Sequence, residues 1–195
     1  MCAMDLLFRP MYAEEIPFWY HTLLAEAFVE TERKPLDDIL SLIADHRYEL
    51  WGLFSGTEML GYAAIWKKDG IPLVLLDYLG VAEAHRNAGL GARILSLLRS
   101  QGRLTVTEAE LPVPGDGEAQ NQLRLRRIRF YQRCGYRPLY PMATCGMAWQ
   151  ALVSDEEAPI GQVMAWHRAL YGPERTDVQI PLAPGDIPAP PYWMK

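Results

Sequence analysis

The chain is poor in cysteine and has no apolar run long enough to cross a membrane. Its 195 residues include only Cys2, Cys134 and Cys145, without Cys-x-x-Cys spacing, which excludes a disulfide scaffold and indicates a reducing compartment. The longest apolar stretch, residues 71–81, contains Asp77 and is far shorter than the ~20 residues that span a bilayer. The beginning of the chain lacks the basic segment of a secretory signal. We therefore expect a cytoplasmic protein that does not bind membranes.

Neither sign of charge is in large excess. The chain has 19 Lys and Arg, 24 Asp and Glu, and a net charge of −5, which argues against a protein built to coat nucleic acid or anionic lipid. The histidines lack the spacing of metal ligands, so we expect no metal site: His21, His46, His85 and His167. Half of the residues are hydrophobic and 22% are charged, the ordinary mixture of a folded globular domain.

The hydrophobic patterns predict a mixed α/β domain. Alternating or continuous apolar runs predict strands over 4–9, 48–54, 59–66, 72–81 and 104–110, and one or two more within 138–153. Apolar residues at helical spacing predict helices over 12–30, 36–46, 87–99, 121–134 and 155–171. The order β-α-α-β-β-β-α-β-α-β predicts a core domain over 1–153, and we expect the C-terminal helix and proline-rich tail, 154–195, to pack on the same domain.

The most informative stretch, residues 73–98, is an apolar strand that leads through a polar turn into a helix. The helix opens with Arg86-x-x-Gly89-x-Gly91, where helix N–H groups attract anions, glycines let a pyrophosphate approach the backbone, and Arg86 adds a cation. A P-loop would need Gly-Lys-Ser/Thr here, and a dinucleotide-binding turn would need a glycine in place of Ile94. The pattern predicts an anion site; the alternative is a connection whose small residues serve close packing.

Two separated motifs resemble those of the GNAT N-acetyltransferase superfamily. Residues 79–91, LGVAEAHRNAGLG, resemble its acetyl-CoA-binding signature, in which a strand ending in Val precedes Arg/Gln-x-x-Gly-x-Gly/Ala. Residues 126–139, RRIRFYQRCGYRPL, resemble its late helix, whose Phe-Tyr pair precedes a Gly-Phe/Tyr. The resemblance covers about residues 5–150 and implies a central mixed, mostly antiparallel sheet flanked by helices. It also implies direct transfer of acetyl from acetyl-CoA to an amine of a small molecule or peptide.

The resemblance implies roles for particular residues. The backbone of Leu79, Gly80 and Val81 would pair with the pantetheine arm of the cofactor. The following turn would hold its pyrophosphate: Arg86, Asn87, Ala88, Gly89, Leu90 and Gly91. Tyr131 matches the tyrosine near the CoA sulfur, where we favour a hydrogen bond to the departing thiolate; the alternatives are a packing role for Tyr131, or Tyr136 in its place.

Three carboxylates are candidates for the base that deprotonates the amine. Asp77 lies within an apolar strand, where an unpaired charge would be costly. Glu108 and Glu110 are two residues apart and are expected on one face of the next strand, where they could instead attract a cationic amine. By resemblance, both strands flank the place where cofactor and acceptor meet. Exposure to solvent, or ion pairs with nearby arginines, is the alternative for all three.

Other functions remain open at this point. A GNAT-like domain can bind acyl-CoA for regulation or partner docking without turnover. The arginines of residues 124–137 could contact the 3′-phosphate of CoA or a nucleic acid, but a solvated helix face balanced by the acids of 108–118 is the usual reading of such a run. An exposed strand or the C-terminal helix could form a homodimer.

Overall fold

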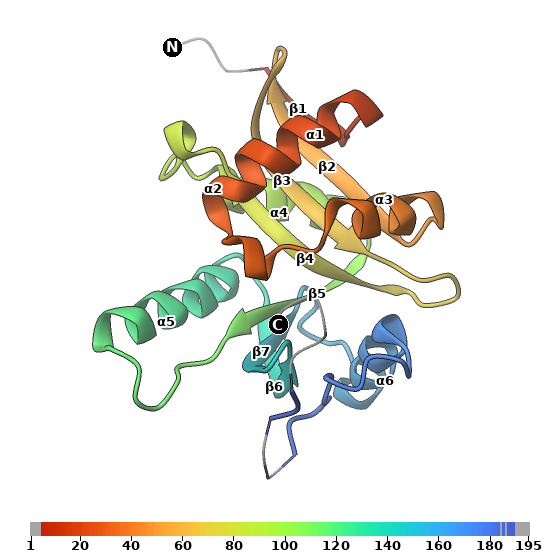
Figure 1. Cartoon of the computed structure of the whole chain (residues 1–195), viewed down its shortest axis with the longest axis vertical. Helices are drawn as coiled ribbons and strands as arrows, with labels where there is room; N and C mark the ends of the chain where they lie inside the picture. The colour runs from red at the N-terminus through yellow and green to blue at the C-terminus, as the bar shows by residue number, and fades with distance from the viewer. Residues whose placement is uncertain (1–4, 184, 186, 190–195) are drawn as a thin grey trace. The chain divides into compact units, whose positions relative to one another are not determined.

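The structure is a computed structural model that describes residues 5–183, 185 and 187–189 (Figure 1). These residues cluster into two compact units. The first unit holds the chain up to residue 69 together with residues 76–102, and the second unit holds residues 70–75 and the chain from residue 103 onward. Cys2 and the last residues of the proline-rich tail lie outside the described part.

In the described part of the chain, seven strands form a mostly antiparallel sheet in the order β1-β2-β3-β4-β5-β7-β6, so the predicted fold class is confirmed. Residues 138–153 supply two strands rather than one. The strands are β1 (Leu6–Pro10), β2 (Tyr48–Ser55), β3 (Glu58–Trp66), β4 (Leu73–Val81), β5 (Leu104–Glu110), β6 (Arg137–Thr144) and β7 (Met147–Val153).

Helices flank the strands at the positions that the apolar spacing indicates. The longer ones are α3 (Leu36–Ala44), α4 (Leu90–Ser100), α5 (Glu118–Arg133) and α6 (Ile160–Tyr171). Short helical turns are η1 (Ala13–Glu15), α1 (Ile16–Phe18), the π-helical η2 (Trp19–Leu24), α2 (Ala25–Ala27), η3 (Glu30–Glu32) and η4 (Glu83–His85). The predicted helix over 12–30 thus ends at Ala27. Phe28 is extended, and its ring packs edge-on against Tyr78 with centroids 5.0 Å apart.

In the first unit, neighbouring residues of β3 contact helices on opposite faces of the sheet. A Cβ at Gly61 would lie 2.9 Å from the Ile94 side chain, so the missing side chain lets α4 approach. The next residue, Tyr62, faces the other way and meets Trp19 of η2 edge-on, with ring centroids 5.8 Å apart. Strand alternation thus places helices on both faces of this part of the sheet (Figure 1).

In the second unit, neighbouring residues of β5 likewise contact different helices. A hydrogen bond links the Thr107 side chain to Tyr131 of α5, and another links the next residue, Glu108, to His167 of α6. Strands β5, β7 and β6 pair antiparallel, and β6 and β7 form a hairpin whose turn contains Cys145 and Gly146, both at positive φ.

A polar cluster fixes the C-terminal segment to the hairpin turn. Asp177 accepts hydrogen bonds from Arg175, from the Thr144 hydroxyl at 3.1 Å and from the Cys145 backbone N–H at 3.0 Å. Burial alone would raise the pKa of Asp177, but the bonds from Arg175 and Cys145 outweigh it and lower this pKa to about 2. The ionised carboxylate is therefore part of the folded structure.

We expect Asp177 to make stability depend on acid pH. Its pKa rises on unfolding, so its contribution is present above pH 4, amounts to about 2 kcal/mol, and is lost as the pH falls toward 2. Urea unfolding of wild type and Asp177→Asn should give a difference in unfolding free energy that narrows between pH 4 and 2. A difference independent of pH contradicts the assignment, and Glu156→Gln, at an exposed position, is the control.

Candidate active site

The turn from β4 into α4 leaves the first backbone N–H groups of α4 without acceptors in the helix. Gly89 caps α4 at φ +78°, and the helix begins at Leu90 rather than at the predicted residue 87, because Asn87 is itself left-handed at φ +66°. The first helical hydrogen bond runs from the Arg93 N–H to the Gly89 carbonyl, at 3.1 Å. The N–H groups of the preceding helical residues therefore have no acceptor within the helix, which makes this end suited to an anion.

The two glycines of the turn have different requirements. Gly89 is exposed with open space around a hypothetical Cβ, yet its positive φ favours glycine on conformational grounds alone. Gly91 is the second residue of α4, where any residue fits the helical backbone. Arg86 is exposed, and its guanidinium donates long hydrogen bonds, each of 3.4 Å, to the uncharged backbone carbonyls of Val81 and Glu26. Its charge is thus available beside the helix end.

Packing against Tyr62 explains why Gly80, near the end of β4, is a glycine. A Cβ at Gly80 would lie 2.3 Å from the Tyr62 ring, so glycine is needed there for packing, whatever else binds the strand. Leu79 and Val81 on either side are half-buried. Their pairing with a pantetheine arm stays a prediction.

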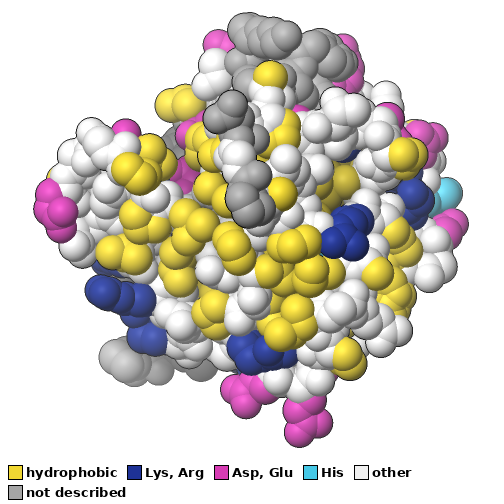
Figure 2. Space-filling view, turned by 90° about the horizontal axis from the view of Figure 1, so that it is seen from below, with side chains coloured by type: hydrophobic (Ala, Val, Ile, Leu, Met, Phe, Trp, Pro, Cys, Tyr) yellow, Lys and Arg dark blue, Asp and Glu magenta, His cyan; other side chains and the backbone are white. Residues whose placement is uncertain are grey.

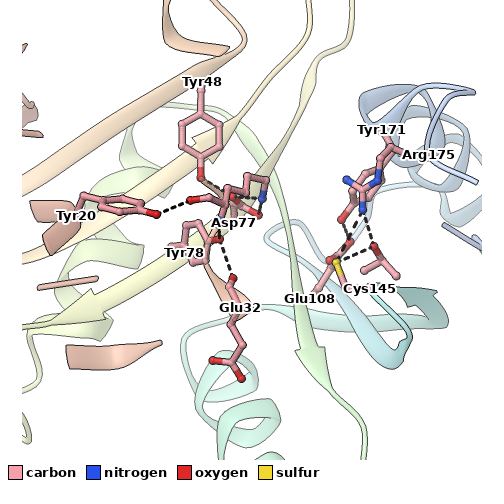
Figure 3. Close-up of polar contacts among 11 residues, drawn as sticks. Tyr20, Glu32, Tyr48, Asp77, Tyr78, Glu108, Cys145, Tyr171 and Arg175 are labelled. Atoms are coloured by element: carbon pink, nitrogen blue, oxygen red, sulfur yellow. Dashed lines mark hydrogen bonds and ion pairs between the residues drawn. The ribbon is translucent and has the colours of Figure 1, made fainter. Parts of the chain in front are cut away.

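Asp77 is held by a lysine that the sequence analysis did not single out. Lys34 Nζ lies 2.8 and 2.7 Å from the two carboxylate oxygens, and Tyr48 donates a further hydrogen bond to Asp77 (Figure 3). The backbone of Lys34 is itself held, since Tyr20 donates to its carbonyl and its N–H donates to Tyr78. Burial and the nearby Asp77 charge raise the pKa of Tyr48 well above its usual value, so Tyr48 stays a donor.

Glu110 is paired with arginines of α5. Its Oε2 accepts from Arg124 Nε at 2.9 Å, and Arg127 lies 3.7 Å from Oε1. Arg124 also bonds Asp116 at 2.6 Å. Glu110 is the last residue of β5, where the chain leaves toward α5, and this explains why its partners differ from those of Glu108.

Among the described residues, Glu108 accepts hydrogen bonds on one oxygen only. His167 Nε2, at 2.9 Å, and the Tyr171 hydroxyl, at 2.7 Å, both donate to Oε1 (Figure 3 shows the contact with Tyr171). Within the described residues no hydrogen bond reaches Oε2, and the side chain keeps 12% of its surface exposed. His167 is fully buried, and its other ring nitrogen lies 3.0 Å from the Tyr140 hydroxyl.

Tyr131 is half-buried on α5. Burial raises the pKa of its hydroxyl, although a hydrogen bond with Thr107 acts in the opposite direction. Its ring meets Tyr136 edge-on with centroids 5.8 Å apart, and Tyr136 is buried. Tyr131 is therefore a neutral phenol near pH 7, able to donate a hydrogen bond.

Some arginines of α5 form ion pairs with acidic residues, as Arg124 does with Glu110 and Asp116. On the face drawn in Figure 2, basic side chains stand apart from one another among apolar and acidic ones.

In the described part of the chain, no group of three or more His, Cys, Asp or Glu side chains is arranged to hold a metal. No helix among the described residues has the length and apolarity to cross a bilayer.

Comparison with known proteins agrees with the two motifs. Residues 46–138 match the family model of the acetyltransferase (GNAT) domain. Among solved structures, one from Bacteroides thetaiotaomicron, described as a GNAT-family acetyltransferase, is 21% identical with a TM-score of 0.67 and covers 87% of this chain and 98% of its own. A GNAT acetyltransferase from Elizabethkingia anophelis with acetyl-CoA bound is 16% identical with a TM-score of 0.56. That match covers 78% of this chain and 99% of the other. No curated protein matched significantly.

Residues 46–138 thus form a domain of the GNAT acetyltransferase family, and the resemblance drawn from the two motifs is confirmed for this part of the chain. The family that this domain matches is one of acetyltransferases. Sequence reasoning missed the contacts that Lys34 and His167 make with the candidate carboxylates Asp77 and Glu108. Neither lies near its carboxylate partner along the chain, and neither forms part of a recognisable motif.

We expect the Lys34–Asp77 pair to stabilise the first unit. Both side chains are mostly buried, at 16% and 14% exposure, so removing one partner leaves a charge without compensation. Asp77→Asn or Lys34→Met alone should each cost roughly 2–4 kcal/mol of unfolding free energy. The double variant should recover part of this loss in urea unfolding. Strictly additive losses would contradict the coupling.

Proposed function

We propose that the protein transfers the acetyl group of acetyl-CoA directly to an amine of a small molecule or peptide. The observation that carries this proposal is the exposed turn of Arg86 to Gly89, which places a cation beside the N-terminal N–H groups of α4, within the residues that match the GNAT acetyltransferase domain. Two of the similar structures are described with acetyl-CoA, those from Elizabethkingia anophelis and Salmonella typhimurium. This supports acetyl-CoA as the ligand whose pyrophosphate binds the turn.

The reaction sets requirements for the protein. The amine nitrogen attacks the thioester carbonyl, a C–N bond forms, the C–S bond breaks, and CoA leaves as a thiolate that takes up a proton. An alkylamine with a pKa of about 10.4 is almost entirely protonated at pH 7, so a base is needed to free its lone pair. A positioned base contributes roughly 10²–10⁴-fold to the rate.

Of the candidate bases, Glu108 fits this role best. Asp77 has both oxygens on Lys34, and Glu110 has both oxygens facing arginines, whereas Oε2 of Glu108 accepts no hydrogen bond from a described residue. We assign the proton of the amine to Oε2 of Glu108. Tyr131 is the proposed hydrogen-bond donor to the departing thiolate, since its phenol stays protonated at neutral pH.

Calorimetric titration with acetyl-CoA, beside desulfo-CoA and ATP, tests the proposal. We expect acetyl-CoA to bind with a Kd on the order of micromolar, and ATP not to bind. Thiol release with a panel of amines then reports turnover. Binding without thiol release for any amine would favour the non-catalytic acyl-CoA-binding function, and no binding at millimolar acetyl-CoA would refute the site.

Gly91→Ala should weaken acetyl-CoA binding without harming the fold. Alanine favours a helix over glycine, but its methyl group crowds a pyrophosphate at the N-terminus of α4. We expect the Kd to rise about tenfold. Gly161→Ala is the matched control, because Gly161 is the second residue of α6 and a Cβ there meets nothing within 4 Å. Equal affinities for both variants would contradict the anion site.

Tyr131→Phe should separate catalysis from binding. We expect kcat to fall about 10²-fold, because the thiolate loses a hydrogen-bond donor, while the Kd for acetyl-CoA changes by less than about twofold. Thiol release and calorimetry measure the two quantities. Tyr12→Phe, at an exposed position, is the control. An unchanged kcat would leave Tyr131 with a packing role.

A further inference from the structure

A chain of hydrogen bonds in the second unit joins Tyr140 of β6, His167 of α6 and Glu108 of β5. Tyr171, one helical turn after His167, completes the set by donating to the same oxygen of Glu108. Three of the four side chains are almost fully buried: Tyr140 at 5%, His167 at 0% and Tyr171 at 5% exposure. Buried polar groups of this kind are costly unless each has its partner, and here each has one.

The way these donors are distributed distinguishes Glu108 from the other carboxylates. The structural ion pairs of Asp77 and Glu110 place cations against both oxygens. His167 and Tyr171 instead converge on Oε1 of Glu108 and leave Oε2 without a bond from a described residue. A carboxylate fixed through one oxygen is held in orientation while the other oxygen can accept a proton.

We infer that His167 is a positioning residue for acetyl transfer, which holds Glu108 through Oε1 so that Oε2 takes the proton of the acceptor amine. This inference rests on the proposed function. His167 touches neither acetyl-CoA nor amine; it acts through Glu108. A carboxylate oxygen only accepts hydrogen bonds, so Nε2 of His167 carries the proton in the contact with Oε1. Nδ1 can then accept from the Tyr140 hydroxyl, which fixes the ring.

The donors also stabilise the charged form of Glu108 through hydrogen bonds. A hydrogen bond to the charged form of a carboxylate favours that form, so loss of a donor makes the carboxylate easier to protonate. The groups that face the Glu108–His167 pair are Tyr140 from β6 and Tyr171 with Arg168 from α6, while Arg175 lies over the Tyr171 ring at 5.0 Å. Burial, and then the charge of Glu108, raises the pKa of Tyr140, so Tyr140 remains neutral over the range of the assay.

The test compares pH profiles of kcat/KM, using the panel amine that gives the fastest thiol release with wild type. Glu108→Gln should lower kcat about 10²-fold and leave the Kd for acetyl-CoA within about twofold. His167→Gln keeps an N–H donor but not the ring, and should lower kcat about tenfold. Tyr171→Phe removes only a hydroxyl, and should move the acidic limb of the profile to higher pH.

The controls separate positioning from packing. His21→Gln changes an exposed histidine of η2 and should leave kcat and the profile unchanged. A purely structural His167 would lower the melting temperature of His167→Gln and Tyr171→Phe without moving the acidic limb of the folded enzyme. Should His167→Gln fail to fold, Tyr171→Phe alone decides, since an unmoved limb overturns the inference. Wild type that releases no thiol with any amine overturns the proposed function itself, and the inference with it.

Discussion

A charged side chain on a largely apolar sheet needs an opposite charge or a hydrogen-bond donor beside it. The carboxylates of β4 and β5 have different partners, and the partner decides what role each carboxylate can have. Asp77 is fixed by a lysine and a tyrosine, and in return it holds the segment of Lys34 to β4. Glu110 is fixed by arginines of α5. Glu108 accepts hydrogen bonds from His167 and Tyr171 on one oxygen, and no described residue reaches its other oxygen. Carboxylates thus have a structural role at two of these positions, and the third, Glu108, is the one that we propose as the base.

The glycines of the β4–α4 turn follow from a different constraint. A strand that ends at Val81 has to reverse into a helix within a few residues, and the left-handed conformations of Asn87 and Gly89 achieve this. Because the helix starts only after Gly89, its first N–H groups point out of the turn together. The proposed anion site therefore follows from the way the chain changes direction, with Arg86 beside it.

The sequence predicts local features of this protein well and distant contacts poorly. Strand positions and the apolar stripe of α4 each depend on residues a few positions apart, and apolar periodicity reports them. Periodicity does not report a left-handed residue, so the start of α4 was placed at residue 87 instead of 90. Lys34 and Asp77 are 43 positions apart, and Glu108 and His167 are 59 apart. Such pairs exist only once the sheet and helices have assembled, so the roles of the carboxylates could not be ranked beforehand.

The segment after Asp177 has a consequence for how copies of the chain can meet. Outer strands of a sheet attract further strands because their outward N–H and carbonyl groups lack partners. Along β6, Gln179 exchanges both backbone hydrogen bonds with Ala143, and Leu182 donates to the Pro141 carbonyl. Pro138 and Pro141 have no N–H to offer. The chain thus blocks this border against strand addition with its own C-terminal segment, and any association of two copies through β6 would first have to displace that segment.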